Sequence, residues 1–249
     1  MSDDITRIAR EIASADHVVA LTGAGVSTAS GIPDFRSEGG IWDQYDPSEF
    51  HYSRFKADPG TFWEKRIEMY ESVFGDDVGP NEAHKTLASL ESDGLLDIVI
   101  TQNIDGLHHE AGSNSVLEIH GNGKRVACEG CGQTVPLDPV VKRVENGERP
   151  PRCESCSDVL KPDVVLFGEP LPQGAMQQAQ RHARQADVFL AVGSSLSVQP
   201  AASLPQVAQR HGATLVTINL EPTGLSATTD FKVLADVTEA LPAIAAELD

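Results

Sequence analysis

The sequence predicts an α/β protein, in which a Rossmann-like parallel sheet with helices on both faces carries a small cysteine-containing module and a helical and loop insertion. Three observations predict this class. Apolar strand-like runs alternate with helical segments along most of the 249 residues. Strands separated by helices imply parallel pairing through right-handed crossovers. Residues 31–79 and 122–162 break the alternation, which is typical of insertions.

The spacing of apolar residues predicts the elements of the α/β frame. Ile5, Ile8 and Ile12 recur at helical spacing within residues 4–14, and the apolar run 17–21 then predicts a short strand. The same reasoning predicts helices over residues 81–93, 173–186, 200–211 and about 236–248, and strands over 95–101, 116–119, 187–193 and 213–219. Within the first insertion, one helix is predicted around residues 60–74.

Charge and apolar content limit the function classes. The chain has 19 basic and 37 acidic residues and a net charge of −18, which argues against non-specific binding of nucleic acids, because basic residues supply most of that affinity. We favour adaptation to a salt-rich cytoplasm over an ordinary acidic protein, since salt screens repulsion between carboxylates. No apolar run approaches the roughly 18–20 residues that span a bilayer. The acidic N-terminal segment lacks a basic signal-peptide region, so we expect a cytoplasmic protein without a membrane partner.

A glycine-rich turn follows the first predicted strand. Residues 23–25 are Gly-Ala-Gly, and small residues let backbone N–H groups approach a phosphate. Thr28 stands where the dinucleotide-binding pattern has its third glycine, and no second strand carries the acidic residue expected about 20 positions on. The chain runs instead into Gly-Ile-Pro-Asp-Phe-Arg at residues 31–36. A nicotinamide dehydrogenase is therefore a poor match.

The four cysteines form two CxxC pairs, Cys128 with Cys131 and Cys153 with Cys156, separated by 21 residues. Two such pairs predict a zinc ribbon, whereas the alternative of two disulfides is disfavoured in a cytoplasmic protein. Four thiolates leave no coordination position for water, so we expect one structural zinc ion in a module over residues 122–162.

That module also has a local excess of basic residues. A nucleic-acid-binding ribbon and a solvated surface both remain open, and we prefer the solvated surface. The residues concerned are Lys124, Arg125, Lys142, Arg143, Arg149, Arg152 and Lys161.

Polar residues follow the ends of two predicted strands. Residues 101–105, Thr-Gln-Asn-Ile-Asp, begin where one strand ends, and open α/β sheets bind ligands at that edge. Asp105 could also cap a helix. His108 and His109 are expected to be surface or packing residues. His120 follows the strand over 116–119, and its position leaves open a structural histidine or a general base. The near-neutral pKa of histidine is what a general base needs.

Taken together, these segments resemble the sirtuin family of NAD-dependent protein deacylases. The resemblance runs nearly end to end and in the correct order. It rests on residues 23–37, 40–42, 101–108, 120–121, 161–172, 193–205 and 218–223, with the four cysteines. The resemblance implies a Rossmann-like NAD-binding domain of residues 1–121 and 163–249, containing the cofactor loop and helical insertion of 31–79, and a zinc module of 122–162.

The resemblance also implies roles for single residues. The catalytic residues are His120, as general base, and Asn103. The NAD-binding residues are Gly23, Ala24, Gly25, Asp34, Phe35, Arg36, Trp42, Gln102, Asn103, Ile104, Asp105, Gly193, Ser194, Ser195, Asn219, Leu220, Glu221 and Val237. The residues that bind substrate are Val165, Phe167, Gly168, Glu169 and Val198, and those that hold zinc are Cys128, Cys131, Cys153 and Cys156.

By resemblance, the protein is a protein-lysine deacetylase that consumes NAD, releases nicotinamide and transfers the acyl group from lysine to ADP-ribose. Its partners are acyl-lysine proteins or peptides, with no direct nucleic-acid binding expected. Two alternatives use the same NAD site, namely mono-ADP-ribosyl transfer and nucleotide sensing without turnover. A zinc amidohydrolase is excluded because four thiolates close the metal site.

The acyl preference is open. Sirtuins that remove succinyl or malonyl groups carry a tyrosine with an arginine three residues later. Here Trp63 replaces the tyrosine and Arg66 can be aligned with the arginine. Trp63 could instead belong to an apolar helix face with Ile67, Tyr70 and Phe74. We favour acetyl-lysine, with desuccinylase or demalonylase activity as the alternative.

Overall fold

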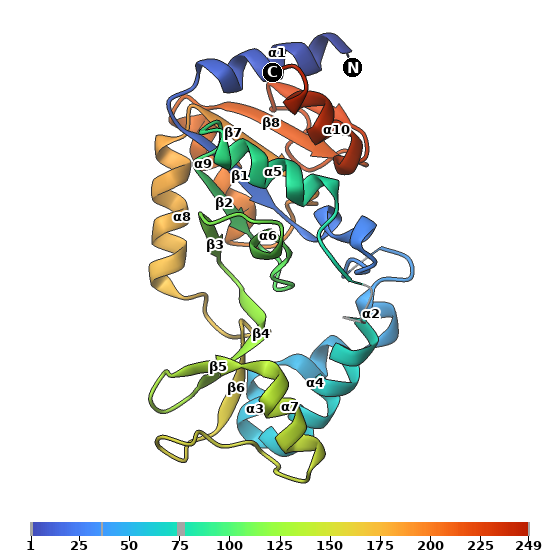
Figure 1. Cartoon of the computed structure of the whole chain (residues 1–249), viewed down its shortest axis with the longest axis vertical. Coiled ribbons are helices and arrows are strands. Elements are labelled where there is room, and N and C mark those ends of the chain that lie inside the picture. Colours follow the sequence, from blue (N-terminus) through green and yellow to red (C-terminus); the bar gives the residue numbers. More distant parts are fainter. Residues whose placement is uncertain (1, 36, 74–77, 249) are drawn as a thin grey trace.

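The computed structural model describes residues 2–35, 37–73 and 78–248. Its main layer is a six-stranded sheet in which every neighbouring pair is parallel (Figure 1). The strands are β1 (Val18–Thr22), β2 (Ile98–Thr101), β3 (Val116–Glu118), β7 (Val188–Val192), β8 (Thr214–Asn219) and β9 (Phe231–Leu234). Their order, β3-β2-β1-β7-β8-β9, is that of a Rossmann sheet, whose halves meet between β1 and β7. The predicted fold class is confirmed.

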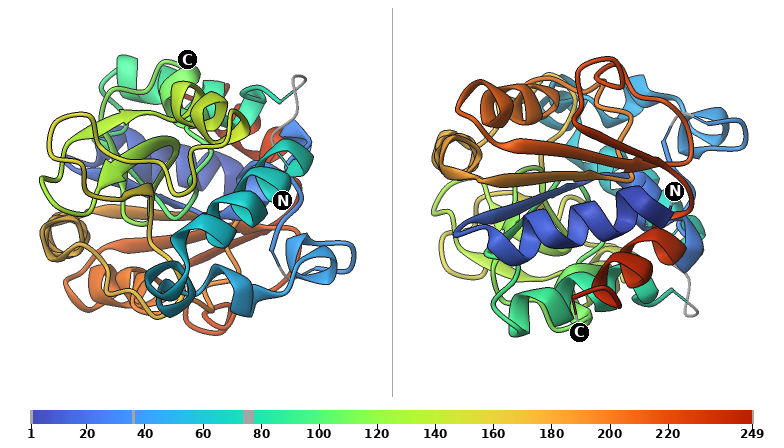
Figure 2. Two further views of the ribbon diagram at one scale, coloured as in Figure 1. Left: turned by 90° about the horizontal axis from the view of Figure 1, so that it is seen from below. Right: turned by 90° about the horizontal axis from the view of Figure 1, so that it is seen from above.

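Helices cover both faces of this sheet (Figure 2). The first group is α1 (Ser2–Ser14), α5 (Glu82–Ser92) and α10 (Val237–Ala245), and the second is α8 (Gln173–Gln185) and α9 (Leu204–Arg210). Each group packs within itself, since α10 contacts α5 and α1, while α8 contacts α9. The sheet is therefore buried from both sides, as the uninterrupted apolar strands predict.

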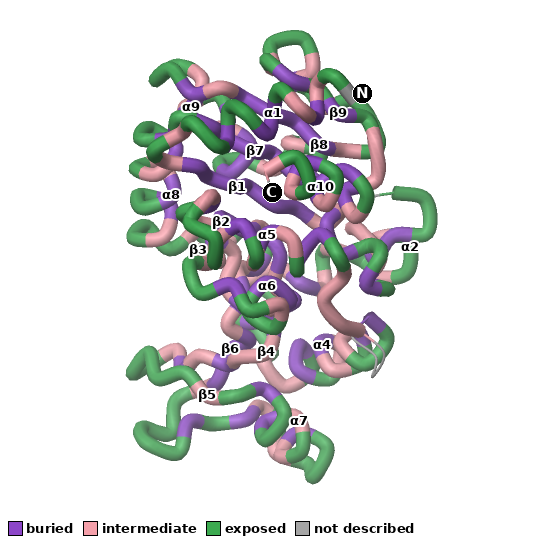
Figure 3. Tube along the Cα trace, turned by 45° about the horizontal axis from the view of Figure 1, so that its top comes forward, coloured by how far each residue is buried: buried purple, intermediate pink, exposed green. Residues whose placement is uncertain are grey.

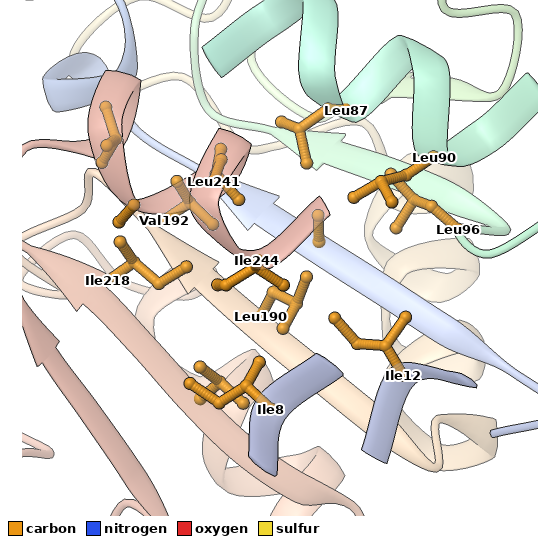
Figure 4. Packing of buried hydrophobic residues seen from close by; sticks show 14 of the residues in the cluster. Ile8, Ile12, Leu87, Leu90, Leu96, Leu190, Val192, Ile218, Leu241 and Ile244 are labelled. Atoms are coloured by element: carbon orange, nitrogen blue, oxygen red, sulfur yellow. The ribbon is translucent and has the colours of Figure 1, made fainter. Parts of the chain in front are cut away.

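The alternation of side chains along the strands divides the core in two. Val188, Leu190 and Val192 of β7 face the α1, α5 and α10 layer, whereas Phe189 faces α8 and α9. Figure 4 shows Leu190 and Ile218 of the sheet against Ile8 and Ile244 of the helices. Figure 3 shows how burial varies along the chain, with buried strands and exposed outer loops.

A smaller unit lies at one end of the sheet unit (Figure 1). Its antiparallel sheet, in the order β5-β4-β6, has the strands β4 (Gly121–Cys128), β5 (Thr134–Pro136) and β6 (Leu160–Val164). Its helices are α2 (Ile41–Gln44), α3 (Tyr52–Ala57), α4 (Pro59–Val73) and α7 (Leu137–Glu145). Trp63 of α4 is fully buried against Val126, Leu137 and Leu160. The two segments that break the α/β alternation thus share one apolar core.

Several boundaries differ from the sequence-based prediction. Strand β9 was not predicted, because only alternate residues of this edge strand, Phe231 and Val233, are buried. Strand β2 begins at Ile98, since the N–H groups of Leu95 and Leu96 donate to Leu90 and end α5. The predicted helix over 200–211 is a 3-10 turn, Ala201–Ser203, followed by α9.

We expect Leu190→Ala to lower the free energy of unfolding by about 2–5 kcal/mol, because it removes methyl groups from a close-packed site between two layers. Leu190 is 1% exposed and Leu234 is 46% exposed, so Leu234→Ala is the matched control and should cost less than about 1 kcal/mol. Urea unfolding of both variants measures the difference, and equal losses would show that the sheet is not the main core.

Candidate active site

A cavity of about 780 Å³ opens at the carboxyl ends of the central strands and continues into the smaller unit. Its lining includes Gly23 after β1, Gln102 after β2 and Gly193 after β7. Met69 of α4 and Val164 of β6 line it from the other side. The cavity therefore lies where the strand order reverses, which is where open α/β sheets bind ligands.

Two glycine turns meet in this cavity wall. The Gly25 N–H donates to the Gly193 carbonyl at 2.8 Å, and the Gly23 N–H donates to the Val192 carbonyl at 3.2 Å. A Cβ added to Gly25 would lie 2.8 Å from the Gly193 oxygen, and one on Gly193, whose φ is +57°, would lie 2.4 Å from the Val26 nitrogen. Only glycine fits, so the wall is bare backbone that a phosphate group can approach closely.

The helix that usually follows a dinucleotide-binding turn is absent here. Two 3-10 turns, Ala24–Val26 and Thr28–Ser30, replace it, and Gly31 ends the second turn at a φ of +87°. The chain then passes Asp34 and Phe35 along the cavity to Trp42. This early stop places an aromatic and acidic segment over the cavity.

A network of buried polar side chains lies under the first turn. The Asn103 Nδ2 group donates to the Gly23 carbonyl at 3.2 Å and to the Ser27 Oγ at 3.0 Å. The Ser27 hydroxyl donates in turn to the Asp105 Oδ2 at 2.7 Å. The Asp105 Oδ1 accepts the Leu107 N–H at 2.9 Å, at the start of α6 (Leu107–Glu110). The N-cap of α6 is Gly106, so the alternative that Asp105 caps the helix as its N-cap is wrong. Asp105 precedes the cap, and its carboxylate fixes the polar network.

His120 lines the cavity between β3 and β4. Its Nδ1 lies 2.9 Å from the Gln102 backbone oxygen. A carbonyl can only accept, so Nδ1 carries the proton and Nε2 keeps a lone pair. Burial lowers the pKa of His120 below its ordinary value of 6.5, although the bond to Gln102 opposes this shift. At neutral pH the ring is therefore uncharged and can accept a proton.

Two further histidines are packing residues. His108 is 2% exposed, and its Nε2 lies 2.9 Å from the Thr22 Oγ1. Burial lowers the pKa of His108 to about 3, so this ring is neutral in the folded protein. Its ring centroid lies 4.9 Å from that of His84. The expectation that His108 is a packing residue agrees with this burial.

Aromatic rings form the wall nearest to the smaller unit. The ring centroids of Trp42 and Phe167 are 5.4 Å apart, as are those of Trp42 and Phe35. Phe167 is 40% exposed although its neighbours are aromatic. Its face is therefore available to an apolar ligand in the cavity.

The four cysteines come together in the smaller unit. All four Sγ atoms lie within 4.8 Å of one another, with 3.4 Å between Cys128 and Cys156 and 3.8 Å between Cys131 and Cys153. Zn–S bonds of about 2.3 Å in a tetrahedron would separate the sulfurs by roughly 3.8 Å. The Gly130 N–H also donates to the Cys128 Sγ at 3.4 Å. The set fits a structural zinc ion, and the sulfurs are too far apart for disulfides.

One protein family matches most of this chain. A family model described as "Sir2 family" matches residues 23–200. The chain belongs to the Sir2 family. The resemblance to sirtuins inferred from the motifs is thereby confirmed.

Several Sir2 relatives match almost the whole chain. An "NAD-dependent protein deacetylase" of Haloarcula marismortui is 52% identical over 99% of this chain and 95% of its own length. An "NAD-dependent protein deacylase 2" of Archaeoglobus fulgidus is 45% identical over 100% of this chain and 97% of its own. A solved Sir2 complex with a p53 peptide and NAD⁺ is 37% identical, with a TM-score of 0.86 over 97% of each chain.

Most of the site residues predicted from the resemblance to sirtuins meet in the one cavity. Those that line it are Gly23, Ala24, Gly25, Asp34, Phe35, Trp42, Gln102, Asn103, Ile104, His120, Val165, Phe167, Gly168, Glu169, Gly193, Ser194, Ser195, Val198, Asn219, Leu220 and Glu221. Asp105 lies beneath the wall, in the polar network. Val237, the first residue of α10, is 5% exposed and belongs to the core, and its predicted contact with adenine stays a prediction. Arg36 lies outside the described residues.

Residues of the smaller unit also line the cavity of this Sir2 protein, namely Arg66 and Met69 of α4 and Phe50. The sequence suggests Arg66 as a partner for an acidic acyl group, but it gives no signal for Met69 or Phe50. The spacing of three residues puts Arg66 and Met69 on one helix face, but nothing in the sequence places that face against β6.

We expect Cys153→Ala to abolish zinc binding and to loosen the smaller unit, because the metal replaces a core that the short sheet lacks. Trp63 shares a core with Cys128 and Cys153, so its fluorescence should shift to the red in a Trp42→Phe background. Zinc content and emission are the two readouts. Ser155→Ala, within the same exposed knuckle, is the control and should retain zinc. Zinc retained at full occupancy in Cys153→Ala would contradict the assignment.

Proposed function

We propose that this Sir2 protein is an NAD-dependent protein-lysine deacetylase, which moves the acyl group of an acyl-lysine to ADP-ribose and releases nicotinamide. The observation that carries the proposal is His120, a neutral histidine whose Nδ1–H is bound to the Gln102 carbonyl and which faces a cavity floored by bare glycine backbone. Such a site combines a proton acceptor with a place for phosphates.

The cavity fits NAD by size and by chemistry. Its volume of about 780 Å³ is in the range of cofactor sites. A Cβ would fill the cradle at Gly23, Gly25 and Gly193, which supports binding of the pyrophosphate there. Asn219, whose Nδ2 donates to the Glu221 carbonyl at 2.9 Å, would hold the adenosine end. When bound, NAD supplies an electrophilic ribose carbon with nicotinamide as the leaving group.

The residues around the opposite end position and shield the reacting groups. Asn103 is 6% exposed and held by Gly23 and Ser27, so it is pre-oriented for contact with the nicotinamide ribose. His120 would accept a proton from a ribose hydroxyl through Nε2. Phe167 and Val198 would enclose the acyl-lysine between apolar side chains.

The substrate is proposed to bind as an extended peptide. Val165 and Gly168 lie on the cavity wall beside Phe167, and pairing with exposed backbone there would give affinity with little demand on sequence. The Sir2 complex with a p53 peptide supports acyl-lysine peptides as the class of partner.

Other features support the remaining expectations. Several cations of the smaller unit are paired within the protein, since Arg143 binds Glu148, Arg149 binds Glu64 and Arg125 binds Asp163. This supports the solvated-surface interpretation over a nucleic-acid site.

Within the described residues, no helix is long and apolar enough to cross a bilayer. Four free thiols suited to zinc favour a reducing compartment, which supports the cytoplasmic location that we propose.

Product analysis tests the proposal. The purified protein is incubated with NAD and an acetyl-lysine peptide at low and at molar salt, and products are followed by mass. A deacetylase yields free lysine, nicotinamide and O-acetyl-ADP-ribose. ADP-ribose attached to peptide or protein would indicate transferase activity, and no consumption of NAD at either salt concentration would indicate a binding protein.

We expect His120→Ala to lower the rate of deacetylation by about 10²–10⁴-fold, the usual contribution of a general base. In the wild type, kcat/KM should fall tenfold per pH unit below the pKa of His120, which burial places under 6.5, because the protonated ring cannot accept a proton. His211→Ala, at an exposed histidine after α9, is the control. Turnover by His120→Ala at the wild-type rate would overturn the role of His120.

Arg66 supports a second candidate, removal of acidic acyl groups such as succinyl or malonyl. Arg66 is 3% exposed, and its two terminal nitrogens have no hydrogen-bond partner among the described residues. Burial lowers its pKa to about 10, so it remains charged at neutral pH. The guanidinium lies 5.5 Å from the centre of the Tyr70 ring. A buried charge without a hydrogen-bonded partner is still costly, and the carboxylate of an acyl group in the cavity would compensate it. Trp63 takes no part, since its Nε1–H donates to the Leu160 carbonyl at 2.8 Å within the core.

We expect Arg66→Met to lower kcat/KM for succinyl-lysine peptides at least tenfold, because a hydrogen-bonded ion pair is lost, and to change that for acetyl-lysine by less than about threefold. Competition between the two peptides in one reaction, read by mass, measures the ratio directly. Arg54→Met at an exposed position of α3 is the control. An equal change for both acyl groups would eliminate the second candidate.

A further inference from the structure

A buried lysine pairs with a carboxylate of the cavity wall. Lys161 of β6 is 6% exposed. Its Nζ donates to the Val164 carbonyl at 2.7 Å, to the Pro162 carbonyl at 3.1 Å and to the Glu169 Oε2 at 3.2 Å. An ammonium group has three donors, so Lys161 is fully satisfied by the segment that follows it in the chain.

Glu169 also forms hydrogen bonds with the backbone of Leu166. Its Oε2 also accepts the Leu166 N–H at 2.9 Å, and its own N–H donates to the Leu166 carbonyl at 3.0 Å. One carboxylate therefore ties Lys161 to the turn formed by residues 164–169. We call these hydrogen bonds of Lys161 and Glu169 the clamp.

The segment held by the clamp bridges the two halves of the cavity. The Val165 N–H donates to the His120 carbonyl at 2.9 Å, and the Tyr52 N–H donates to the Phe167 carbonyl at 2.9 Å. Gly168 has a φ of +76°, and a Cβ there would lie 2.2 Å from the His51 ring. Any change in the curve of this segment would therefore move the wall that carries Phe167.

Burial separates this pair from the other lysine–carboxylate pairs that the structure describes. The Lys161 side chain is 8% exposed, compared with 41–56% for Lys56, Lys65, Lys85 and Lys124. Desolvation of a buried pair can cancel its attraction, so such a pair need not add to stability. The pair instead fixes geometry, because one ammonium group holds the Pro162 carbonyl, the Val164 carbonyl and the Glu169 carboxylate.

We propose that Lys161 and Glu169 are positioning residues that hold residues 164–168 in the curve receiving the acyl-lysine peptide. The clamp thereby sets the affinity for an extended peptide backbone, and leaves NAD binding and the chemical step unaffected. The inference rests on the proposed function, because it assigns a device to the same site.

Steady-state kinetics of Lys161→Met test the proposal. We expect the KM for an acetyl-lysine peptide to rise at least tenfold, with kcat and the KM for NAD within about threefold of wild type. Lys85→Met removes an exposed lysine paired with Glu82 and is the matched control. Lys161→Gln also removes the charge but keeps an amide donor, so it should reproduce the effect if Lys161→Met folds poorly.

Direct binding separates this inference from the proposed function. Anisotropy of a labelled acetyl-lysine peptide, in the absence of NAD, reports affinity without turnover. Weaker peptide binding by both variants, with wild-type zinc content and NAD affinity, supports the clamp even if no deacetylation is found. Wild-type peptide affinity in either folded variant, or an equal loss for peptide and NAD, would overturn it.

Discussion

The site depends on the contact between two backbone turns at the ends of β1 and β7. Gly25 and Gly193 approach to 2.8 Å through a hydrogen bond, and neither position has room for a Cβ. This contact closes the sheet edge where the strand order reverses, so that polar residues after β2 and β8 converge on one cavity. The second 3-10 turn ends at Gly31, and Asp34, Phe35 and Trp42 then line the cavity. The place proposed for the pyrophosphate of NAD follows from this constraint.

The smaller unit forms the other wall of the cavity, and its own apolar core is small. Four cysteines suited to zinc stabilise one end, and Trp63 of α4 packs against β4 and β6 at the other. This packing turns Arg66 and Met69 toward the cavity and fixes the strand β6 that leads into Phe167. The smaller unit, with its cysteine cluster suited to zinc, thus supports one wall of the cavity.

Local patterns in the sequence predicted much of this structure. The zinc cluster and the glycine turn depend on spacings of a few residues, and the polar residues after β2 are located by the end of one apolar strand. Features that depend on packing between distant segments were not predictable. The placing of Met69 in the cavity wall and the edge strand β9, which is only four residues long, belong to this group. The contact of Lys161 with Glu169 is closer in sequence, but neither side chain has a pattern that predicts it. Family resemblance placed His120 in the site, but its tautomer follows only from the Gln102 carbonyl.

The proposed chemistry requires that the sheet edge presents a neutral imidazole with a free Nε2 to the cavity. ¹⁵N chemical shifts of the His120 ring, followed from pH 5 to pH 8, report its tautomer and its pKa. We expect the Nδ1–H tautomer at pH 7 and a pKa below 6.5. A protonated Nε2 at pH 7, or a pKa above 6.5, would show that the ring does not act as the base.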